Sequence, residues 1–351
     1  METVPLAEVL PTHTTPLFAA AVQRAAACLR LGGLVALPTE TVYGLAANAL
    51  DAAAVVRIFQ AKGRPSHNPI IVHISSLEMA HRCVLDWSPE ADRLARAFWP
   101  GPLTLVLRAS ADIPSAVTAG GATVGVRWPS HPMIRAVIEA CDFPLAAPSA
   151  NRANEVSPTN ASHVLRSLGM RIPLIVDGGQ SQVGIESTVV DLTTTPATLL
   201  RPGMVNESAL LAELGSLAHL AGSATGSTLL RSPGQLPRHY APRARLVLRA
   251  WTSETELANQ LVELRAHPAT TAVLCHTQIP LGLPGLKVSV IPHDAEAFAR
   301  SIYAELHQCD LDGMELIVVE SVPDSSDWRA IRDRLQRASV PVKPGRLDGS
   351  R

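Results

Sequence analysis

Aromatic and charged residues are scarce in this sequence. Only 4% of its 351 residues are aromatic and 17% are charged, and 30 Lys and Arg against 31 Asp and Glu leave a formal net charge of −1. A broad face that binds nucleic acid needs a surplus of Lys and Arg, and single-stranded bases need aromatic platforms. The composition therefore argues against a protein that functions mainly by binding nucleic acid. It is compatible with a transient RNA partner.

Cysteines are few and long apolar runs are absent. The five cysteines are scattered, odd in number and without paired ligand spacing. That pattern argues against a disulfide framework or a zinc site and indicates a reducing compartment. Met1 to Pro5 do not resemble a signal peptide, and no run approaches the roughly 18 to 20 apolar residues that span a bilayer. We therefore expect a cytoplasmic protein with no membrane contact.

Hydrophobic residues make up 47% of the chain, and a chain of this length usually forms more than one domain. Up to about residue 214, strand-like and helix-like runs follow one another without strict alternation, which predicts a mixed α/β sheet. The predicted helices are 16–31, 52–60, 89–98 and 132–140. The predicted strands are 34–37, 70–74, 103–107, 123–127, 145–147, 174–177, 187–192 and 198–200.

The composition changes between residues 215 and 243, where Gly222–Ser227 is typical of a linker. Beyond it, predicted strands alternate with predicted helices, the strands at 246–248, 272–274, 288–291 and 316–319 and the helices at 254–266, 295–307 and 328–337. This alternation predicts a smaller, mostly parallel, Rossmann-like domain without a glycine-rich nucleotide fingerprint. The predicted organisation is a first domain over 1–214, a linker over 215–243 and a second domain over 244–351.

The segment from Lys62 to Asn68 places two cations, a hydroxyl and an amide within seven residues. Arginine offers phosphate a rigid fork of donors, and lysine adds a compact charge. Short basic loops are also common as solvated connectors, so the spacing alone leaves both interpretations open. The usual phosphate loop, Gly-x-x-x-x-Gly-Lys-Ser/Thr, is absent. A phosphate site here would have to be built from side chains.

Other polar residues lie at the ends of predicted strands, where ligands bind in open α/β folds. They are Thr41, His73, Arg127, Ser149, Ser187 and Arg201. Each has an ordinary structural interpretation as a strand-edge hydroxyl, a core histidine or a surface arginine. A nucleoside triphosphate and a carboxylate-bearing second substrate would together suit the four cations Lys62, Arg64, Arg127 and Arg201.

Six motifs resemble, in order, those of the Sua5/YciO/YrdC family. They are Pro38–Leu45, Lys62-x-Arg64 with Ser66-x-Asn68, Thr123–Arg127, Ala147–Asn151, Glu186–Asp191 and Leu200–Gly203. Ser232-Pro233-Gly234 and His239–Pro242 resemble the long Sua5-type architecture. The resemblance spans about residues 31–203. It implies a YrdC-like mixed twisted sheet with a concave active-site surface, a linker that folds over it, and a smaller Rossmann-like α/β domain.

The resemblance also implies an activity: a nucleotidyltransferase that joins L-threonine, bicarbonate or CO2 and ATP into L-threonylcarbamoyladenylate and releases pyrophosphate. A transferase complex then passes the threonylcarbamoyl group to tRNAs that read codons beginning with A. The implied threonine-binding residues are Thr41, His73, Arg127, Ala147 through its backbone, and Ser187. The implied ATP-binding residues are Lys62, Arg64, Asn68, Thr123, Ser149, Ser157, Arg201 and Ser232.

Lys62 and Arg64 are the implied catalytic residues, because they would offset charge on the triphosphate as pyrophosphate leaves, with Mg²⁺ accompanying ATP and its ligands unassigned. The sequence departs from the family pattern at His67, within the basic loop. It also departs after Gly234, where Met-Lys-like residues are expected.

Two alternatives remain at this stage. One is a carbamoyl-adenylate-forming enzyme like the hydrogenase maturation proteins, whose zinc-finger and acylphosphatase modules have no counterpart here. The other is a non-catalytic module that binds double-stranded RNA. The nearly neutral net charge weighs against it, because phosphate contacts supply most non-specific affinity for nucleic acid. A weak contact with tRNA is compatible with either enzyme.

Overall fold

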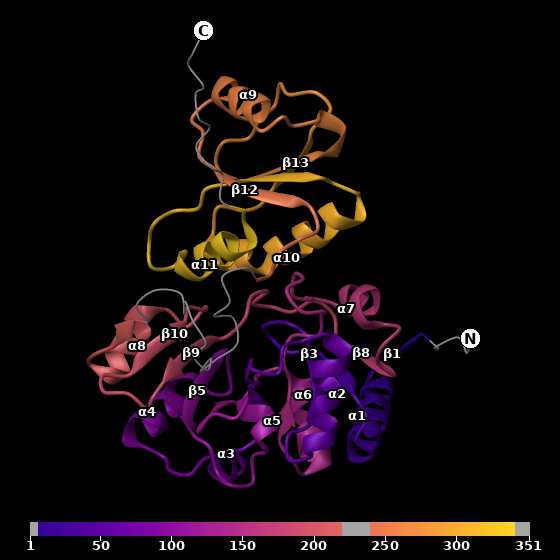
Figure 1. Ribbon diagram of the computed structural model, residues 1–351, viewed down its shortest axis with the longest axis vertical. Coiled ribbons are helices and arrows are strands. Elements are labelled where there is room, and N and C mark those ends of the chain that lie inside the picture. The colour runs from indigo at the N-terminus through magenta and orange to yellow at the C-terminus, as the bar shows by residue number, and fades with distance from the viewer. Residues whose placement is uncertain (1–5, 220–238, 341–351) are drawn as a thin grey trace.

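Two α/β units, one above the other in Figure 1, form the molecule. The computed structural model describes residues 6–219 and 239–340. The first unit contains an eleven-stranded sheet in the order β1-β8-β2-β3-β7-β4-β6-β5-β9-β10-β11, and the second contains a four-stranded sheet in the order β12-β15-β13-β14. Gly222–Ser227 and Ser232, which belong to the predicted linker, lie outside the described residues.

The large sheet is mixed, as predicted. Strands β4 and β6 run parallel, whereas β2 and β3 form an antiparallel pair. The strands are β1 (Glu8–Pro11), β2 (Val35–Leu37), β3 (Gly44–Asn48), β4 (Val72–His73), β5 (Leu103–Arg108), β6 (Thr123–Arg127), β7 (Leu145–Ala146), β8 (Leu174–Asp177), β9 (Thr188–Asp191), β10 (Thr198–Arg201) and β11 (Ala218–His219). Strand β4 is shorter than the predicted 70–74, because the Ile70 amide bonds to Val117 outside the ladder.

The helices of the first unit are α1 (Thr15–Arg30), α2 (Ala52–Lys62), α3 (Leu77–Cys83), α4 (Pro89–Phe98), α5 (Ser115–Thr118), α6 (Pro132–Cys141), α7 (Ala161–Leu168) and α8 (Glu207–Leu214). Each of these helices except α5 follows a residue whose side chain accepts a hydrogen bond from an amide of the first turn. Asp51 caps α2 by accepting from two backbone amides, and Gly63 ends it with φ +61°. Because α2 ends there, Lys62 lies in its last turn and Arg64 begins the following loop.

The second unit is a small α/β domain, as the alternation predicts, and its sheet is fully parallel where the sequence predicts a mostly parallel one. Its elements are β12 (Arg245–Arg249), α9 (Glu254–Glu263), a 3₁₀ turn (Pro268–Thr270), β13 (Thr271–Cys275), β14 (Lys287–Val290), α10 (Ala295–Leu311), β15 (Leu316–Glu320) and α11 (Arg329–Ala338). Helix α9 stops before the predicted residue 266 because Arg265 adopts a left-handed φ of 55°.

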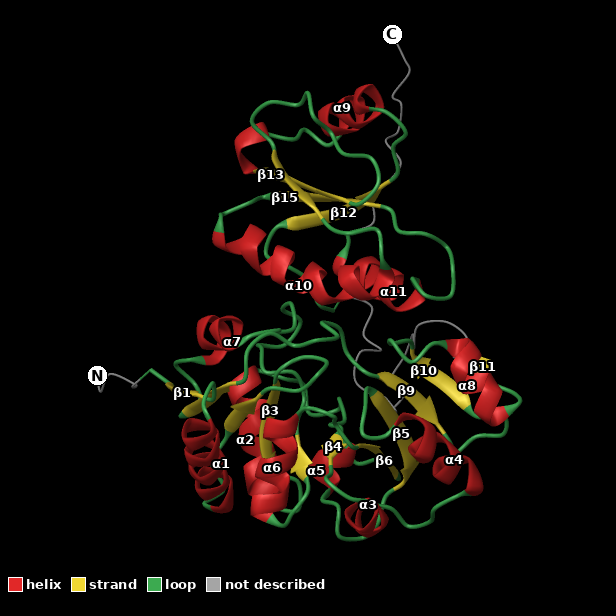
Figure 2. Ribbon diagram, turned by 180° about the vertical axis from the view of Figure 1, so that it is seen from behind, coloured by secondary structure: helices red, strands yellow, loops and turns green. Residues whose placement is uncertain are grey.

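The two units share a hydrophobic core. Helices α10 and α11 cover the face of the small sheet that looks toward the first unit (Figures 1 and 2). Val42, Val156 and Ile185 of the first unit belong to the same buried cluster as Ile302 of α10 and Leu335 of α11. Burial of apolar surface at this contact favours a fixed relation between the units.

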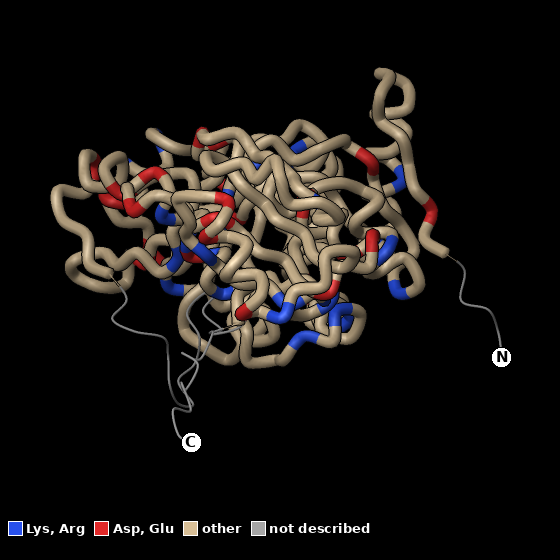
Figure 3. Tube along the Cα trace, turned by 90° about the horizontal axis from the view of Figure 1, so that it is seen from above, with Lys and Arg blue, Asp and Glu red and all other residues tan. Residues whose placement is uncertain are grey.

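Acidic and basic residues are interspersed along the trace, as the nearly neutral net charge suggests (Figure 3). Among the described residues, no helix combines the length and hydrophobicity needed to cross a membrane.

Candidate active site

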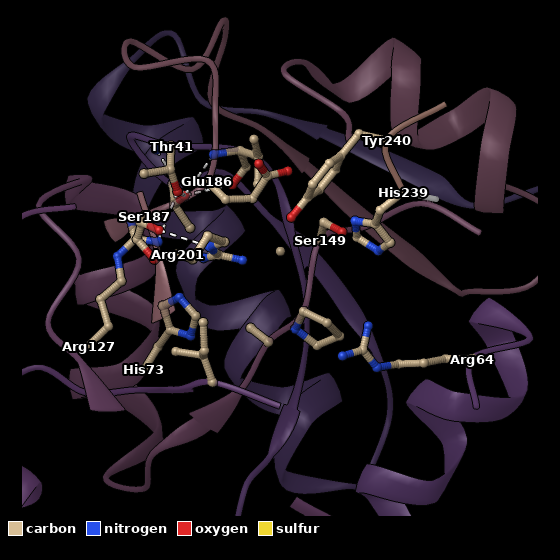
Figure 4. A pocket seen from close by; sticks show the side chains of 16 residues that line it. Thr41, Arg64, His73, Arg127, Ser149, Glu186, Ser187, Arg201, His239 and Tyr240 are labelled. Atoms are coloured by element: carbon tan, nitrogen blue, oxygen red, sulfur yellow. Dashed lines mark hydrogen bonds between the residues drawn. The ribbon is translucent and has the colours of Figure 1, made fainter. Parts of the chain in front are cut away.

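A pocket with an empty volume of about 530 Å³, its open mouth included, lies where several strands of the large sheet end. The parallel register of β4 and β6 sets His73 opposite Arg127 at their carboxyl ends. Arg201 ends β10, and Ser187 directly precedes its antiparallel neighbour β9. The sheet order therefore gathers side chains that are far apart in sequence around one pocket (Figure 4).

The pocket contains all five residues implied to bind threonine. They are Thr41, His73, Arg127, Ala147 and Ser187. Gly44 also lines it and forms an isolated bridge with Ser149. A Cβ on Gly44 would lie 3.2 Å from the Cβ of Ala147. A larger residue at either position would therefore crowd this side of the pocket.

Arg127 forms a buried ion pair with Glu40. Its Nη2 lies 2.7 Å from Glu40 Oε1, and both side chains are 5% exposed. Its Nη1 donates to Thr41 Oγ1 at 2.9 Å, and its Nε donates to the Gly101 carbonyl at 3.3 Å. Burial raises the pKa of Glu40, but the charge and hydrogen bonding of Arg127, together with hydrogen bonds from backbone amides, hold the pKa below its ordinary value. The guanidinium is thus preoriented in the pocket wall.

His73 is a neutral imidazole in this pocket. Its side chain is 3% exposed, and burial together with the charge of Arg127 lowers its pKa to about 3. Its Nδ1 has no hydrogen-bond partner among the residues that the structure describes. A neutral histidine with an unsatisfied nitrogen can donate or accept one hydrogen bond from a ligand without adding charge.

Ser187 is held by two neighbours. Its Oγ lies 2.8 Å from Thr104 Oγ1. Arg201 donates to the same Oγ at 3.1 Å from Nη2 and to the Ser187 carbonyl at 3.0 Å from Nε. Arg201 therefore joins the implied threonine and ATP sets in one hydrogen-bonded group.

Lys62 and Arg64 take different positions. The Lys62 ammonium donates to the carbonyl oxygens of Ser149 and Asn151, and desolvation and then the Arg64 charge place its pKa well below the ordinary value. Arg64 donates to the carbonyls of Asn68 and Pro69 at 3.2 and 2.9 Å. Desolvation lowers the pKa of Arg64 to about 10, so it stays charged at neutral pH. Lys62 thus fastens the 149–151 loop, whereas Arg64 lines the pocket.

A second, smaller pocket adjoins the first on the side of the basic loop. Its lining contains four of the residues implied to bind ATP: Lys62, Arg64, Asn68 and Ser149. Arg64 and Ser149 line both pockets. The two hollows therefore share part of their wall, and residues implied to bind threonine lie close to residues implied to bind ATP.

Two described residues implied to bind ATP line neither pocket. Thr123 begins β6, opposite Arg108 and at the other end of the strand from Arg127, and it lines neither pocket. Ser157 is fully buried and donates to Glu186 Oε1 at 2.5 Å. Ser232 lies outside the described residues.

Several buried polar atoms in the linings of the two pockets have no hydrogen-bond partner among the described residues. Asn68 Oδ1, His73 Nδ1, Asn151 Oδ1 and His239 Nδ1 are among them. Buried polar groups in folded proteins are normally paired. Such a cluster in the wall of a pocket therefore marks a place where a polar ligand completes the hydrogen bonding.

The structure adds residues to which the motifs assigned no ligand role. Glu40 and Glu186 lie inside the quoted motifs, and each pairs with an arginine. His239 and Tyr240, noted as a motif next to the linker, line the pocket directly. Thr104 could not be found from sequence, because nothing in its surroundings along the chain distinguishes it from a strand residue.

Two family models match consecutive parts of the chain. The Sua5/YciO/YrdC model, described as telomere recombination, matches residues 27–203, and a model described as the C-terminal domain of threonylcarbamoyl-AMP synthase matches residues 207–340. The threonylcarbamoyl-AMP synthase of Pyrococcus abyssi is 39% identical over 90% of this chain and 93% of its own length. That of Bacillus subtilis is 38% identical over 91% of this chain and 92% of its own.

Solved structures match over both units. Crystalline P. abyssi Sua5 complexed with L-threonine superposes with a TM-score of 0.87 at 36% identity, covering 95% of this chain and 97% of that one. A double variant of the same protein superposes with a TM-score of 0.86 at 35% identity, covering 95% and 96%. The chain therefore belongs to the Sua5/YciO/YrdC family, in its long two-domain Sua5 form.

Proposed function

We propose that this chain is a threonylcarbamoyl-AMP synthase, which forms L-threonylcarbamoyladenylate and pyrophosphate from L-threonine, bicarbonate or CO2, and ATP. The observation that carries the proposal is the convergence of Thr41, His73 and Arg127 with Arg64 and Ser149 in one pocket. Relatives that share about nine-tenths of their length with this chain carry that activity as their name. One of them is solved with L-threonine bound.

On the threonine side, a charged guanidinium and neutral hydrogen-bonding groups surround the substrate. Arg127 attracts the threonine carboxylate, and its ion pair with Glu40 keeps the guanidinium in place before the substrate arrives. Thr41 and Ser187 offer hydroxyls, and neutral His73 offers a ring nitrogen. Because His73 carries no charge, it does not compete with Arg127 for the carboxylate.

In the chemical step, the threonine amine, carried as a carbamate, presents an oxygen to the α-phosphorus of ATP. A new O–P bond forms while the bond from the α-phosphorus to the bridging oxygen breaks, and the electron pair leaves with pyrophosphate. This reaction depends mainly on positioning and charge stabilisation. Arg64 and Arg201 supply positive charge, and Lys62 contributes by holding the loop that carries Ser149.

Mg²⁺ enters, in this proposal, bound to the phosphates of ATP. Among the described residues there is no group of three His, Cys, Asp or Glu side chains that could hold a metal ion. Glu186 of the pocket lining pairs with Arg334, and Glu40 pairs with Arg127. These residues do not fit a protein-built metal cage, so no step is assigned to a protein-bound metal.

The product is a mixed anhydride of a carbamic and a phosphoric acid, which water hydrolyses. A transferase complex that modifies tRNA is the proposed recipient. We expect at most a weak direct contact of this chain with tRNA, because its formal net charge is −1.

The test is substrate dependence of pyrophosphate release. Purified protein should form pyrophosphate from ATP only when threonine and bicarbonate are both present. Equal turnover without threonine would contradict the proposed synthase activity. Salt-sensitive binding of double-stranded RNA with no pyrophosphate would favour the non-catalytic module.

A further inference from the structure

Glu186 connects the pocket wall to the second unit. It directly precedes Ser187 and lines the pocket. Three side chains donate to its carboxylate: Ser157 Oγ to Oε1 at 2.5 Å, Tyr303 OH to Oε2 at 3.1 Å, and Arg334 Nε to Oε2 at 2.7 Å. Tyr303 belongs to α10 and Arg334 to α11. Two of these three donors therefore come from the second unit.

Arg334 is an unusual residue for such a place, because its long charged side chain is only 1% exposed. Besides Glu186, it pairs with Asp333 at 2.7 Å. Its guanidinium carbon also lies 5.4 Å from the ring centre of Tyr240, which lines the pocket. Burying a guanidinium is costly unless its charge is matched. The carboxylates of Glu186 and Asp333 provide that match.

Glu186 lies in the electrostatic field of two arginines. Burial raises its pKa, but the charges of Arg334 and Arg201 and the hydrogen bonds from Ser157 and Arg334 together lower it more, so its pKa lies below the ordinary value. Arg201 lines the pocket, whereas Arg334 lies at the contact between the units. Figure 4 shows Glu186, Ser187 and Arg201 on the same wall.

We propose that Arg334 is a positioning residue for ATP: it holds the Glu186 carboxylate toward the second unit and thereby limits how far that carboxylate neutralises Arg201. The inference rests on the proposed function, in which Arg201 serves the phosphates. In a buried site a carboxylate that swings toward an arginine cancels much of the charge available to a polyanion. Tyr303 supports the same orientation through one neutral hydrogen bond.

The second unit offers a matched control. Arg329 lies on the same helix as Arg334 and forms an ion pair across the units with Glu207, in the first unit. Arg329→Ala therefore removes a contact between the units without touching Glu186. If loosening of the contact between the units were the whole effect, Arg329→Ala and Arg334→Ala would change the kinetics alike.

The experiment measures KM for ATP and for threonine, and the calorimetric Kd for ATP, in wild-type protein and both variants. Arg334→Ala should raise KM and Kd for ATP about tenfold, with a change of less than about threefold in KM for threonine. Arg329→Ala should change each by less than about twofold. Adding Glu186→Gln to Arg334→Ala should bring the Kd for ATP back to within about threefold of wild type, because the charge that competes for Arg201 is gone.

The inference would be overturned if Arg334→Ala and Arg329→Ala raised the Kd for ATP equally. It would also be overturned if the double variant with Glu186→Gln bound ATP as weakly as Arg334→Ala alone. If Arg334→Ala does not fold, Tyr303→Phe removes one donor to Glu186 and keeps the ring. Tyr303→Phe should raise the Kd for ATP about twofold to threefold, and adding Glu186→Gln should reverse this increase. An unchanged Kd for ATP in Tyr303→Phe would then contradict the inference. Failure of the wild-type protein to form pyrophosphate would instead contradict the proposed function.

Discussion

The strand ends of the two sheets make an instructive contrast. In the first unit, His73 and Arg127 end parallel strands beside a pocket in which some buried polar atoms have no partner within residues 6–219 and 239–340. In the second unit, Glu320 ends β15, and its carboxylate accepts from the backbone amides of His276 and Thr277 at 2.6 and 2.9 Å. The amide of Gln278 donates to it as well, at 3.3 Å.

Those successive amides are the kind of backbone nest that binds anions. In this protein, Glu320 fills the nest with its own carboxylate. The contrast teaches that a position at the carboxyl end of a parallel strand is not sufficient for a ligand site. What decides is whether the polar groups there are already satisfied by the protein, as they are around Glu320, or are left for a ligand, as around His73.

The largest expected effect comes from the ion pair that prepares the first site. Arg127→Ala should raise KM for threonine at least about 100-fold, because it removes the charge that meets the carboxylate. It should also lower the free energy of unfolding by about 3 kcal/mol, because Glu40 is left buried without its partner. Steady-state kinetics and denaturant unfolding measure the two effects. Arg108→Ala, which breaks an exposed pair with Asp86, is the control and should change neither. An unchanged KM would mean that threonine binds elsewhere.

A smaller effect is expected on the phosphate side. Arg64→Ala should weaken the binding of ATP about 10-fold to 100-fold, because Arg64 supplies charge to the phosphates alone. The KM for threonine should change less than about threefold. His67→Ala is the matched control, since His67 is an exposed residue of the same loop. Equal losses for both substrates in Arg64→Ala would show that the two sides of the pocket are not separable.

Substitution of Glu320, at the end of β15, should lower the stability of the protein and leave catalysis unchanged. Glu320→Ala leaves the amides after β13 without their acceptor and should cost about 3 kcal/mol of unfolding free energy. KM values should stay within about twofold of wild type. Thermal unfolding and kinetics of the same preparation check both. A large change in KM for ATP would break the contrast and point to a ligand role for the second sheet.

The pH dependence of stability gives the smallest effect. The folded pKa of His73 is about 3, so the folded protein leaves this group neutral while the unfolded chain takes up a proton near pH 6.5. Protons bound only in the unfolded state lower stability, so stability falls as pH drops below 6.5. Between pH 7 and pH 5 the contribution of His73 is about 2 kcal/mol. Urea unfolding of His73→Gln should show a correspondingly weaker loss, and an equal loss would contradict a neutral buried His73.

The sequence predicted the fold well where patterns are long and capped. Helices α4 and α6 and strand β6 lie within one residue of their predicted bounds. It missed short elements such as β3 and α7, because a few residues carry too little periodicity to be told from a loop. It also gave β4 too many residues, since hydrophobicity does not show which backbone amides pair with a neighbouring strand.

By itself, the sequence determined which chemical groups are available: the ordered motifs, the basic loop after α2, and the arginines at strand ends. Only the tertiary structure decided what those groups contact. Lys62 fastens the 149–151 loop and Arg127 pairs with Glu40, and Glu186 is held by an arginine 148 residues away. The physical reason is that buried charges must find partners, and the order of strands and the packing of α11 on the first unit determine which partners lie within reach.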